Sequence, residues 1–314
     1  MPKGEEAGRD GLGEQIQAAR EFAPGLEIQQ IKSSVRARLF GTFDGAPKVG
    51  GYTLRRMIGR GGMGAVFEAV GRDGEALALK VLRGFEPAAL YRFKLEFRAL
   101  ADISHPNLAL LHNLVVRGDQ AYLTMELVDG EDFLTHVCRE PAGRAERLRA
   151  ALVQLVAGLE ALHAAGKLHR DIKPSNVLVT REGRVVILDF GLVSELAGRG
   201  APEQLVGTPA YMAPEQLLGA PPSAASDWYA VGVMIFEALA GRLPFEGQDM
   251  MREKCERDAP PPPVDGDPRL AGLCARLLSR RPDDRPTGPE LAGLLAGREP
   301  EVLPVRARSL AGMA

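Results

Sequence analysis

Residues 169–179 read HRDIKPSNVLV, and this stretch decides the fold class of the chain. Five polar or ionisable side chains stand here between a predicted helix and an apolar strand: His169, Arg170, Asp171, Lys173 and Asn176. Burying such groups without partners costs free energy, so a cluster this dense beside a core is seldom only structural. The stretch therefore predicts a site of chemistry at the junction of a helix and a strand.

A second acidic residue follows at the end of the next apolar strand. Asp189 lies in VVILDFG, residues 185–191, eighteen positions after Asp171. The side-chain oxygens of Asp189 and Asn176 are ligands of the kind that Mg²⁺ shares with substrate phosphates. Asp171 is then left free to accept a proton from an attacking hydroxyl.

A glycine-rich turn precedes these segments. Residues 58–66 read IGRGGMGAV and lie between two strand candidates rather than before a helix. This placement argues against a dinucleotide fingerprint, and the absence of Gly-Lys-Ser/Thr argues against a Walker loop. Two strands that close over phosphates need glycines, because side chains block the approach of the backbone. Taken alone, the turn is explained about equally well as a structural hairpin.

Two oppositely charged residues follow the turn. Lys80 ends the apolar strand ALALK sixteen residues after Gly64, and Glu96 lies sixteen residues further on in a helical segment. A lysine on a buried strand needs an anion to meet. Apolar neighbours in FKLEFRAL favour the inward face for Glu96, which makes it a candidate partner of Lys80. The alternative is a glutamate on the solvated face of the helix.

The character of the sequence changes along the chain. Residues 1–50 mix charges and contain a helical apolar stripe within residues 26–40, which predicts an N-terminal helical arm and linker. Residues 51–128 read as short strands around one helix, and residues 129–296 are mainly helical. Residues 297–314 lose periodicity and read as a tail or linker. The sequence predicts an α+β, two-lobed architecture with a ligand cleft between the lobes.

The composition argues against several other classes of protein. The formal net charge of −2 over 314 residues gives no support to nucleic-acid binding. No apolar run approaches the roughly 18 residues of a membrane span, and the polar first residues do not resemble a signal peptide. The three scattered cysteines lack metal-ligand spacing and read as free thiols. We therefore expect a cytoplasmic protein.

The ordered set of motifs resembles the eukaryotic-type (Hanks-type) serine/threonine protein kinases of bacteria. The resemblance runs from about Tyr52 to Leu295 and rests on GRGGMGAV, Lys80, Glu96, HPN (105–107), HRDIKPSN, DFG, GTPAYMAPE (207–215), DWYAVG, LPF and RPDDRP. It implies the bilobal kinase fold, with a small antiparallel sheet and one main helix, a larger helical lobe, and ATP bound between them. The implied reaction is transfer of the γ-phosphate of ATP to serine or threonine hydroxyls of protein substrates.

The resemblance also implies roles for the charged residues. Lys80 would hold the α- and β-phosphates of ATP and be oriented by Glu96. Asp171 would be the catalytic base. Asn176 and Asp189 would bind Mg²⁺, with Mn²⁺ as an alternative.

Further positions take structural or substrate-facing roles by the same resemblance. Lys173 would reach the transferring phosphate, and Thr208 would tie the substrate-facing loop to Asp171. Asp227 would brace the catalytic loop from an apolar helix. An ion pair is implied between Glu215 and Arg285.

The same resemblance implies an ATP pocket formed by the glycine-rich turn, several apolar residues and a hinge. The implied pocket residues are Ile58, Gly59, Arg60, Gly61, Gly62, Met63, Gly64, Val66, Ala78, Lys80, Met125, Glu126, Val128 and Leu178. Met125 would be the gatekeeper, and the backbone of residues 126–128 would hydrogen-bond adenine. For the apolar members the structural and functional interpretations coincide, because core positions there also touch the ligand.

The segment between DFG and APE lacks the usual phosphorylation site. Relatives commonly phosphorylate a residue shortly before GT, and the phosphate pairs with the arginine that precedes the catalytic aspartate. Arg170 is present, but residues 195–207 contain no Ser, Thr or Tyr. We hypothesise that this loop phosphorylation is absent. Glu203 is either a weak anionic substitute or, by the simpler interpretation, solvated.

Three alternatives stay open at this point. A pseudokinase or ATP-binding scaffold is disfavoured because Lys80, Asp171 and Asp189 are all present. A small-molecule kinase is disfavoured by GTPAYMAPE, which forms a platform for a polypeptide in the family. The stripe within residues 26–40 can pack on the small lobe, on a second copy of the chain or on a regulatory partner.

Overall fold

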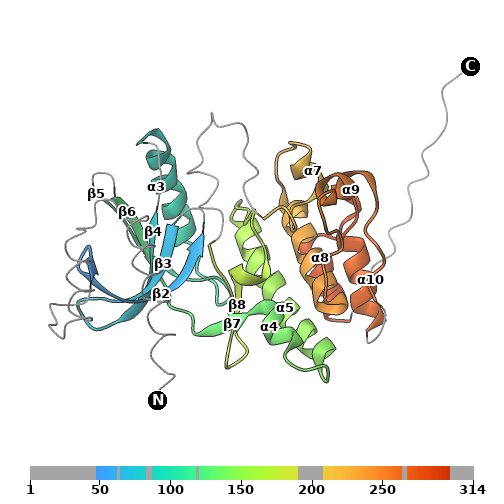
Figure 1. The fold of residues 1–314 in the computed structure, drawn as a ribbon, viewed down its shortest axis with the longest axis horizontal. Coiled ribbons are helices and arrows are strands. Elements are labelled where there is room, and N and C mark those ends of the chain that lie inside the picture. The colour runs from blue at the N-terminus through green and yellow to red at the C-terminus, as the bar shows by residue number, and fades with distance from the viewer. Residues whose placement is uncertain are drawn as a thin grey trace, which may run out of the picture.

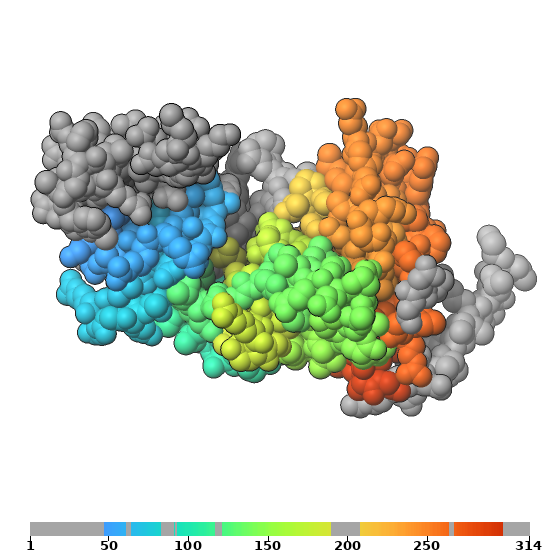
Figure 2. All heavy atoms as spheres, turned by 60° about the horizontal axis from the view of Figure 1, so that its bottom comes forward, coloured from blue at the N-terminus to red at the C-terminus, as the bar shows by residue number. Residues whose placement is uncertain are grey.

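The computed structural model describes most of the region predicted to be two-lobed. It covers residues 47–61, 64–82, 87–117, 120–189, 208–263 and 267–297. The predictions for residues 1–46, for Gly62 and Met63, for the segment 190–207 and for residues 298–314 lie outside it. A strand-rich lobe is followed by a helical lobe, which confirms the predicted α+β bilobal fold (Figure 1). In a space-filling view the first strands and the last helices lie at opposite ends of the molecule (Figure 2).

Short apolar runs separated by glycine-containing turns form the sheet of the small lobe. Its strands are β1 (Lys48–Val49), β2 (Tyr52–Gly61), β3 (Gly64–Val70), β4 (Ala76–Leu82), β5 (Leu111–Arg117) and β6 (Gln120–Met125). They pair antiparallel in the order β1-β2-β3-β4-β6-β5. The sheet begins at Lys48, slightly before the expected start at residue 51, and Val49 is buried in an apolar cluster of this sheet.

One helix, α3 (Pro87–Ala101), follows β4 and precedes β5 in the sequence, and it stands beside the sheet (Figure 1). Phe93, Phe97 and Leu100 follow the spacing of a helical apolar stripe and are buried. They share one apolar core with residues of β4 and β6 and with the helices of the large lobe. The core therefore runs across both lobes.

Helices make up most of the large lobe. They are α4 (Phe133–Cys138), α5 (Arg144–Ala164), α7 (Pro214–Leu217), α8 (Ala224–Ala240), α9 (Met250–Glu256), α10 (Pro268–Leu277) and α11 (Gly288–Leu295), with single turns η1 (Pro174–Asn176) and η2 (Pro282–Asp284). Helix α8 is almost wholly apolar, and its residues are buried from Ser226 to Phe236 because α4, α5 and α10 surround it. The prediction that this segment is buried is confirmed. Among the described residues, no helix is both long and apolar enough to cross a membrane.

A small sheet supports the polar stretch that opened the sequence analysis. It consists of β7 (Gly130–Asp132), β8 (Val177–Thr180) and β9 (Val185–Ile187), paired antiparallel in that order. Residues 168–176, called the polar loop below, connect α5 to β8. The polar residues thus lie between a helix and an apolar strand, as predicted.

The segment after α3 is anchored to the large lobe. Asn107 of the HPN motif donates hydrogen bonds from Nδ2 to Gln154 Oε1 at 3.0 Å and to the carbonyl of Val185 at 2.7 Å. The backbone N–H of Ala109 donates to the carbonyl of Ile187 at 3.0 Å. These bonds fix the segment that follows α3 against the strands next to the polar loop and Asp189.

Candidate active site

Asp227 of α8 holds the polar loop in shape. Its buried carboxylate accepts hydrogen bonds from the backbone N–H groups of His169 at 2.9 Å and Arg170 at 2.8 Å. Nε2 of His163 lies 2.8 Å from the same carboxylate. Arg170 has a φ of 67°, which non-glycine residues adopt only when their surroundings enforce it. The predicted brace from α8 is confirmed, and it supports this strained backbone.

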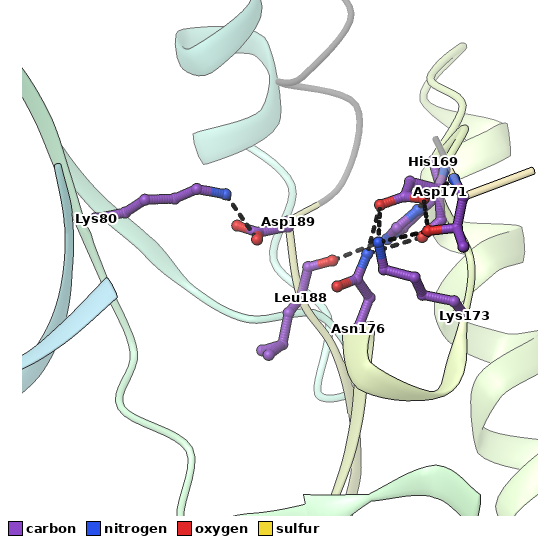
Figure 3. Close-up of polar contacts among 8 residues, drawn as sticks. Lys80, His169, Asp171, Lys173, Asn176, Leu188 and Asp189 are labelled. Atoms are coloured by element: carbon purple, nitrogen blue, oxygen red, sulfur yellow. Dashed lines mark hydrogen bonds and ion pairs between the residues drawn. The ribbon is translucent and has the colours of Figure 1, made fainter. Parts of the chain in front are cut away.

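His169 connects the polar loop to the strand end that carries Asp189. Burial lowers the pKa of His169, although the Asp227 carboxylate and the Leu188 carbonyl act in the opposite direction. A neutral imidazole has one donor and one acceptor nitrogen. Nε2 donates to the carbonyl of Leu188 at 2.8 Å, and Nδ1 accepts from the backbone N–H of Asp171 at 3.2 Å. One ring therefore ties both aspartates of the site to the same frame (Figure 3).

The carboxylate of Asp171 is hydrogen-bonded on both oxygens. Oδ2 accepts from Lys173 Nζ at 2.7 Å and from Asn176 Nδ2 at 3.0 Å (Figure 3). Oδ1 accepts from the backbone N–H of Thr208 at 3.1 Å, and Lys173 Nζ also donates to Thr208 Oγ1 at 2.9 Å. The expected link between Thr208 and Asp171 is present. These contacts fix the direction in which the carboxylate points.

The ion pair expected between Lys80 and Glu96 is replaced by two others. Lys80 is 9% exposed, and its Nζ lies 2.7 Å from Asp189 Oδ2 (Figure 3). Glu96 instead accepts from Lys167 Nζ at 2.8 Å. The expectation that a buried lysine meets an anion is correct, but the expected partner is wrong for this structure. The reason is tertiary: the fold brings Lys167, just before the polar loop, into contact with Glu96 of α3.

Asp189 sits on an unusual backbone conformation of its own. Its φ is 55°, and its side chain leaves the end of β9 towards Lys80 (Figure 3). Asn176 is held by its amide nitrogen, which donates to the carbonyl of Asp171 at 2.8 Å as well as to the carboxylate. Its amide oxygen faces the side on which Asp189 lies (Figure 3). Among the described residues no group of three or more His, Cys, Asp or Glu side chains is placed to hold a metal alone.

The described part of the glycine-rich turn joins β2 to β3. Gly59 pairs with Val66, Arg60 pairs with Ala65 and Gly61 pairs with Gly64. A Cβ on Gly64 would lie 1.8 Å from the carbonyl oxygen of Val81, and its φ is 149°. Gly64 is therefore required by the close approach of β4, in addition to any role near phosphate. A Cβ on Gly59 would meet only Val66, at an ordinary 3.7 Å.

The apolar residues expected around adenine divide into two sets. Ala78 and Met125 face each other across β4 and β6 and are buried, and Val66 and Val128 pack against the same core. Ile58 is 39% exposed and lies outside that core. Leu178 of β8 is half-buried and belongs to the large lobe.

Residues 208–213, called the 208–213 loop below, run from Thr208 to α7. Glu215 at the start of α7 forms a bidentate pair with Arg285, at 2.7 and 2.8 Å, and the Arg285 side chain is fully buried. Burial alone would raise the pKa of Glu215, but the hydrogen bonds and charge of Arg285 lower it. The predicted pair is confirmed. It fixes the end of the loop to the turn before α11.

A small hollow opens between the polar loop and the 208–213 loop. Its lining includes Arg170, Asp171, Ile172, Thr208, Tyr211, Met212, Gln216, Ser226, Asp227 and Ala230. Tyr211 donates a hydrogen bond to Glu237 at 2.6 Å, and burial together with that carboxylate raises the pKa of Tyr211. Asp171 and Thr208 thus face the same space as the loop that follows Thr208.

Comparison with known proteins agrees with this geometry. Residues 52–293 match the family model described as the protein kinase domain. The chain belongs to the protein kinase family. The similar curated proteins include several bacterial proteins named as serine/threonine-protein kinases, which places this chain in the bacterial Hanks-type group.

Three of these relatives show the extent of the similarity. PknA of Mycobacterium tuberculosis is 36% identical over 270 residues, which cover 80% of this kinase and 63% of that protein. PkaB of Streptomyces coelicolor is 35% identical over 287 residues, covering 86% of this chain and 66% of the relative. Pkn1 of Myxococcus xanthus is 37% identical over 258 residues, covering 76% and 36%. The chain thus spans less than two thirds of the length of these relatives.

Glu126, expected to belong to the hinge, is held by a residue that the sequence did not predict. Arg184 lies beside Glu126, at 2.7 Å from Oε1, and donates from Nε to the carbonyl of Pro106 at 2.8 Å. The Glu126 backbone N–H donates to the carbonyl of Leu110 at 2.8 Å. In the described residues, the backbone N–H and C=O of Val128 enter no hydrogen bond.

The sequence analysis also did not predict the contacts of two further lysines. Lys167 pairs with Glu96, and Lys254 of α9 is buried beneath the 208–213 loop. Neither has a sequence signal, because Lys167 follows a turn glycine and Lys254 stands in the polar run MMREKCER. Only the tertiary structure brings each lysine to its partner.

Proposed function

We propose that this kinase transfers the γ-phosphate of ATP to serine and threonine hydroxyls of protein substrates. The observation that carries the proposal is the fixed carboxylate of Asp171, which is hydrogen-bonded by Lys173, Asn176 and Thr208. A positioned carboxylate beside a hollow is suited to accept a proton from a bound hydroxyl. The printed names of the bacterial relatives support serine and threonine as acceptors.

The proposed reaction assigns one role to each charged side chain. Asp171 accepts the proton of the substrate hydroxyl while that oxygen forms its bond to the γ-phosphorus. The bond between the γ-phosphorus and the bridging oxygen breaks, and ADP leaves. Lys173, which already contacts Asp171, places positive charge beside the transferring group, where charge stabilisation is the main catalytic contribution.

Asn176 and Asp189 fit a Mg²⁺ ion, with Mn²⁺ as an alternative. Mg²⁺ is usually bound through one or two protein oxygens together with substrate phosphates. The amide oxygen of Asn176, at the end of η1, and the carboxylate of Asp189, after the end of β9, supply such oxygens (Figure 3). When bound, the metal would neutralise charge on the phosphates. For this, Asp189 has to give up Lys80.

The two ion pairs of this structure correspond, in our proposal, to a resting arrangement of the kinase. Lys80 would leave Asp189 to hold the α- and β-phosphates, and Glu96 would leave Lys167 to orient Lys80. After the exchange Lys80 would be paired with Glu96 and the phosphates and Asp189 with the metal, while Lys167, whose side chain is partly exposed, would be released to solvent. Kinase activity depends on the Lys–Glu pair being in place.

Adenine would bind between Val66, Ala78, Met125 and the hinge. Glu126 is fixed by Arg184 and Leu110, while the backbone of Val128 retains a donor and an acceptor among the described residues. An aromatic base needs apolar walls and a few placed polar groups, and this combination provides both. The glycine-rich turn, Ile58 and Leu178 would complete the pocket.

Two regulatory predictions remain beyond the described residues. The segment 190–207 would function without phosphorylation, because it offers no hydroxyl from residue 195 onward. The stripe within residues 26–40 would contact the small lobe, a second copy or a regulatory partner. No nucleic acid takes part in the proposed function.

Phosphate transfer from labelled ATP with Mg²⁺ tests the proposal. The wild type, Asp171→Asn and the exposed control Asp102→Asn are incubated with a basic protein acceptor, and mass spectrometry locates the modified residues. We expect Asp171→Asn to lose activity by about 10²- to 10⁴-fold, the usual contribution of a general base, and the control to match the wild type. Nucleotide binding without transfer in the wild type would contradict the proposal and favour a silent ATP-binding module.

A further inference from the structure

Lys254 is buried although its sequence surroundings are polar. It lies in α9, within MMREKCER, yet it is only 1% exposed. Its Nζ donates to the carbonyl oxygens of Pro209 at 3.0 Å, Ala210 at 2.7 Å and Met212 at 3.0 Å. All three acceptors belong to the 208–213 loop, which starts at the residue bonded to Asp171.

The number of contacts matches the chemistry of an ammonium group. An ammonium has three N–H donors, and each finds one carbonyl here. In the described residues Lys254 has no carboxylate partner; the ring of Tyr229 lies 5.6 Å from Nζ. Burying a charge with only dipoles and a ring around it costs free energy, and burial lowers the pKa of Lys254 to about 8. At neutral pH the group nevertheless carries its proton.

The loop is held from three directions, and Lys254 holds its centre. Thr208 binds Asp171 at one end, and Glu215 binds Arg285 beyond the other. Tyr211 bonds to Glu237 of α8. Between these points the Gln216 side chain accepts from the backbone N–H of Ala213, whereas Lys254, from a separate helix, draws three of the four consecutive carbonyls of residues 209–212 to one atom.

We propose that Lys254 is a positioning residue for the protein substrate, because it fixes the backbone surface that lies beside Asp171. The inference rests on the proposed kinase activity. The hollow lined by Asp171, Thr208, Tyr211 and Met212 borders this surface, so a polypeptide that reaches Asp171 has to lie along the loop. ATP would bind on the other side of Asp171, towards Lys80 and the hinge, and does not contact α9. Lys254 therefore acts on the polypeptide and not on the nucleotide.

The test separates the two substrates. Lys254→Met keeps an unbranched apolar side chain, one atom shorter and without donors, and Lys254→Gln keeps two donors. The matched control is Arg252→Met on the same helix, where the guanidinium is 63% exposed. For each variant, the KM for a serine-containing peptide, the KM for ATP, kcat, and ATP hydrolysis without peptide are measured.

We expect Lys254→Met to raise the peptide KM about tenfold or more, because three buried carbonyls lose their donors. The KM for ATP and peptide-independent hydrolysis should stay within about twofold, the scatter of surface substitutions. Lys254→Gln should be intermediate, and Arg252→Met should match the wild type. A purely structural role would not produce this difference between the two KM values.

Several results would overturn the inference. The inference is wrong if the peptide KM of Lys254→Met is unchanged, or if the KM values for peptide and ATP rise equally. It is also wrong if Arg252→Met shows the same effect as Lys254→Met. Loss of the folded state in both Lys254 variants, measured by circular dichroism, would assign the residue to stability alone. If the wild type transfers no phosphate to any peptide, the proposed function fails first, and this is distinguishable because the wild type then has no peptide KM.

Discussion

Replacing Lys167 by methionine should activate the kinase. Lys167 Nζ lies 2.8 Å from Glu96 Oε2, and Lys80 Nζ lies 2.7 Å from Asp189 Oδ2. Glu96 can orient Lys80 only after it leaves Lys167. A methionine side chain at this position would preserve the apolar stem and remove the competing charge, so the exchange would become easier.

The structure sets the size of the effect. The side chains of Lys167 and Glu96 are 23% and 24% exposed, so solvent screens their attraction only in part. Exposed pairs contribute about 0.2–1 kcal/mol, and we take about 1–2 kcal/mol for this partly buried pair. A free-energy change of that size alters an equilibrium by roughly five- to thirtyfold. The rate of phosphate transfer should rise by up to this factor if the resting arrangement dominates.

The assay is the initial rate of peptide phosphorylation at fixed ATP and Mg²⁺. Lys94→Met is the matched control, since Lys94 is an exposed lysine on α3, two residues before Glu96. It removes the same charge near the same helix without touching the pair. An unchanged or reduced rate in Lys167→Met, with the variant folded, would refute the reasoning that Lys167 competes with Lys80. Equal activation by Lys94→Met would refute it as well, because the cause would then be general electrostatics.

Two predictions concern stability. Arg285→Met should lower the free energy of unfolding by about 3–5 kcal/mol, because it leaves the Glu215 carboxylate largely buried without its partner; chemical denaturation measures this. The pKa of Lys254 falls from its ordinary 10.5 to about 8 on folding, so between these values the unfolded chain binds more protons and the contribution of Lys254 to stability rises with pH. Relative to Lys254→Met, the free energy of unfolding of the wild type should rise by roughly 3 kcal/mol across this pH window. Chemical denaturation at several pH values measures this difference.

Each of these two stability predictions has its own control. Arg281→Met on the same turn removes a 77% exposed guanidinium and should change stability by less than about 0.5 kcal/mol. A loss below about 1 kcal/mol in Arg285→Met would contradict the assignment of a buried ion pair. For Lys254, parallel pH profiles of wild type and variant would show that burial does not perturb its titration.

The motif residues were predictable from the sequence because the motifs occur together, and in order, in the protein kinase family. Their contacts are nevertheless long-range: Asp227 binds two N–H groups of the polar loop, 57 and 58 residues away, and Thr208 binds Asp171 across 37 residues. The resemblance, and not local loop shape, therefore predicted these contacts. The strand pattern was predictable for a different reason, since periodic apolar runs and glycine turns specify the sheet without further information.

The partner of Lys80 was not predictable to the same degree. Lys80 lies on β4, Glu96 on α3, and Asp189 and Lys167 on the large lobe, so the choice depends on how α3 sits relative to that lobe. Sequence spacing contains no measure of that placement. Lys254 is a further case, because a lysine in a charged helix reads as solvated until the fold places a loop over it.

The glycines of the turn between β2 and β3 show a different limit of prediction from the sequence. By itself, the sequence explains the glycines of the turn about equally well by access to phosphates and by a structural hairpin. In the structure Gly64 is also required by the carbonyl of Val81 on β4, whereas a Cβ on Gly59 would make an ordinary 3.7 Å contact with Val66 among the described residues. A residue type can thus be predicted correctly while part of its physical reason lies elsewhere.

The hydrogen bonds of Asn107 make the C-terminal end of α3 the point about which the helix would rotate. Asn107 and Ala109, six and eight residues after Ala101, are bonded to the large lobe, and we therefore take the C-terminal end of the helix as its pivot. At 1.5 Å per residue, Glu96 stands only about 8 Å from Ala101, whereas the N-terminal end of α3 is about 21 Å away. A displacement of about 1 Å at Glu96 therefore corresponds to nearly 3 Å at the far end. Whatever pushes on the tip of α3 does so with a mechanical advantage of almost three over the ion pair that it has to break.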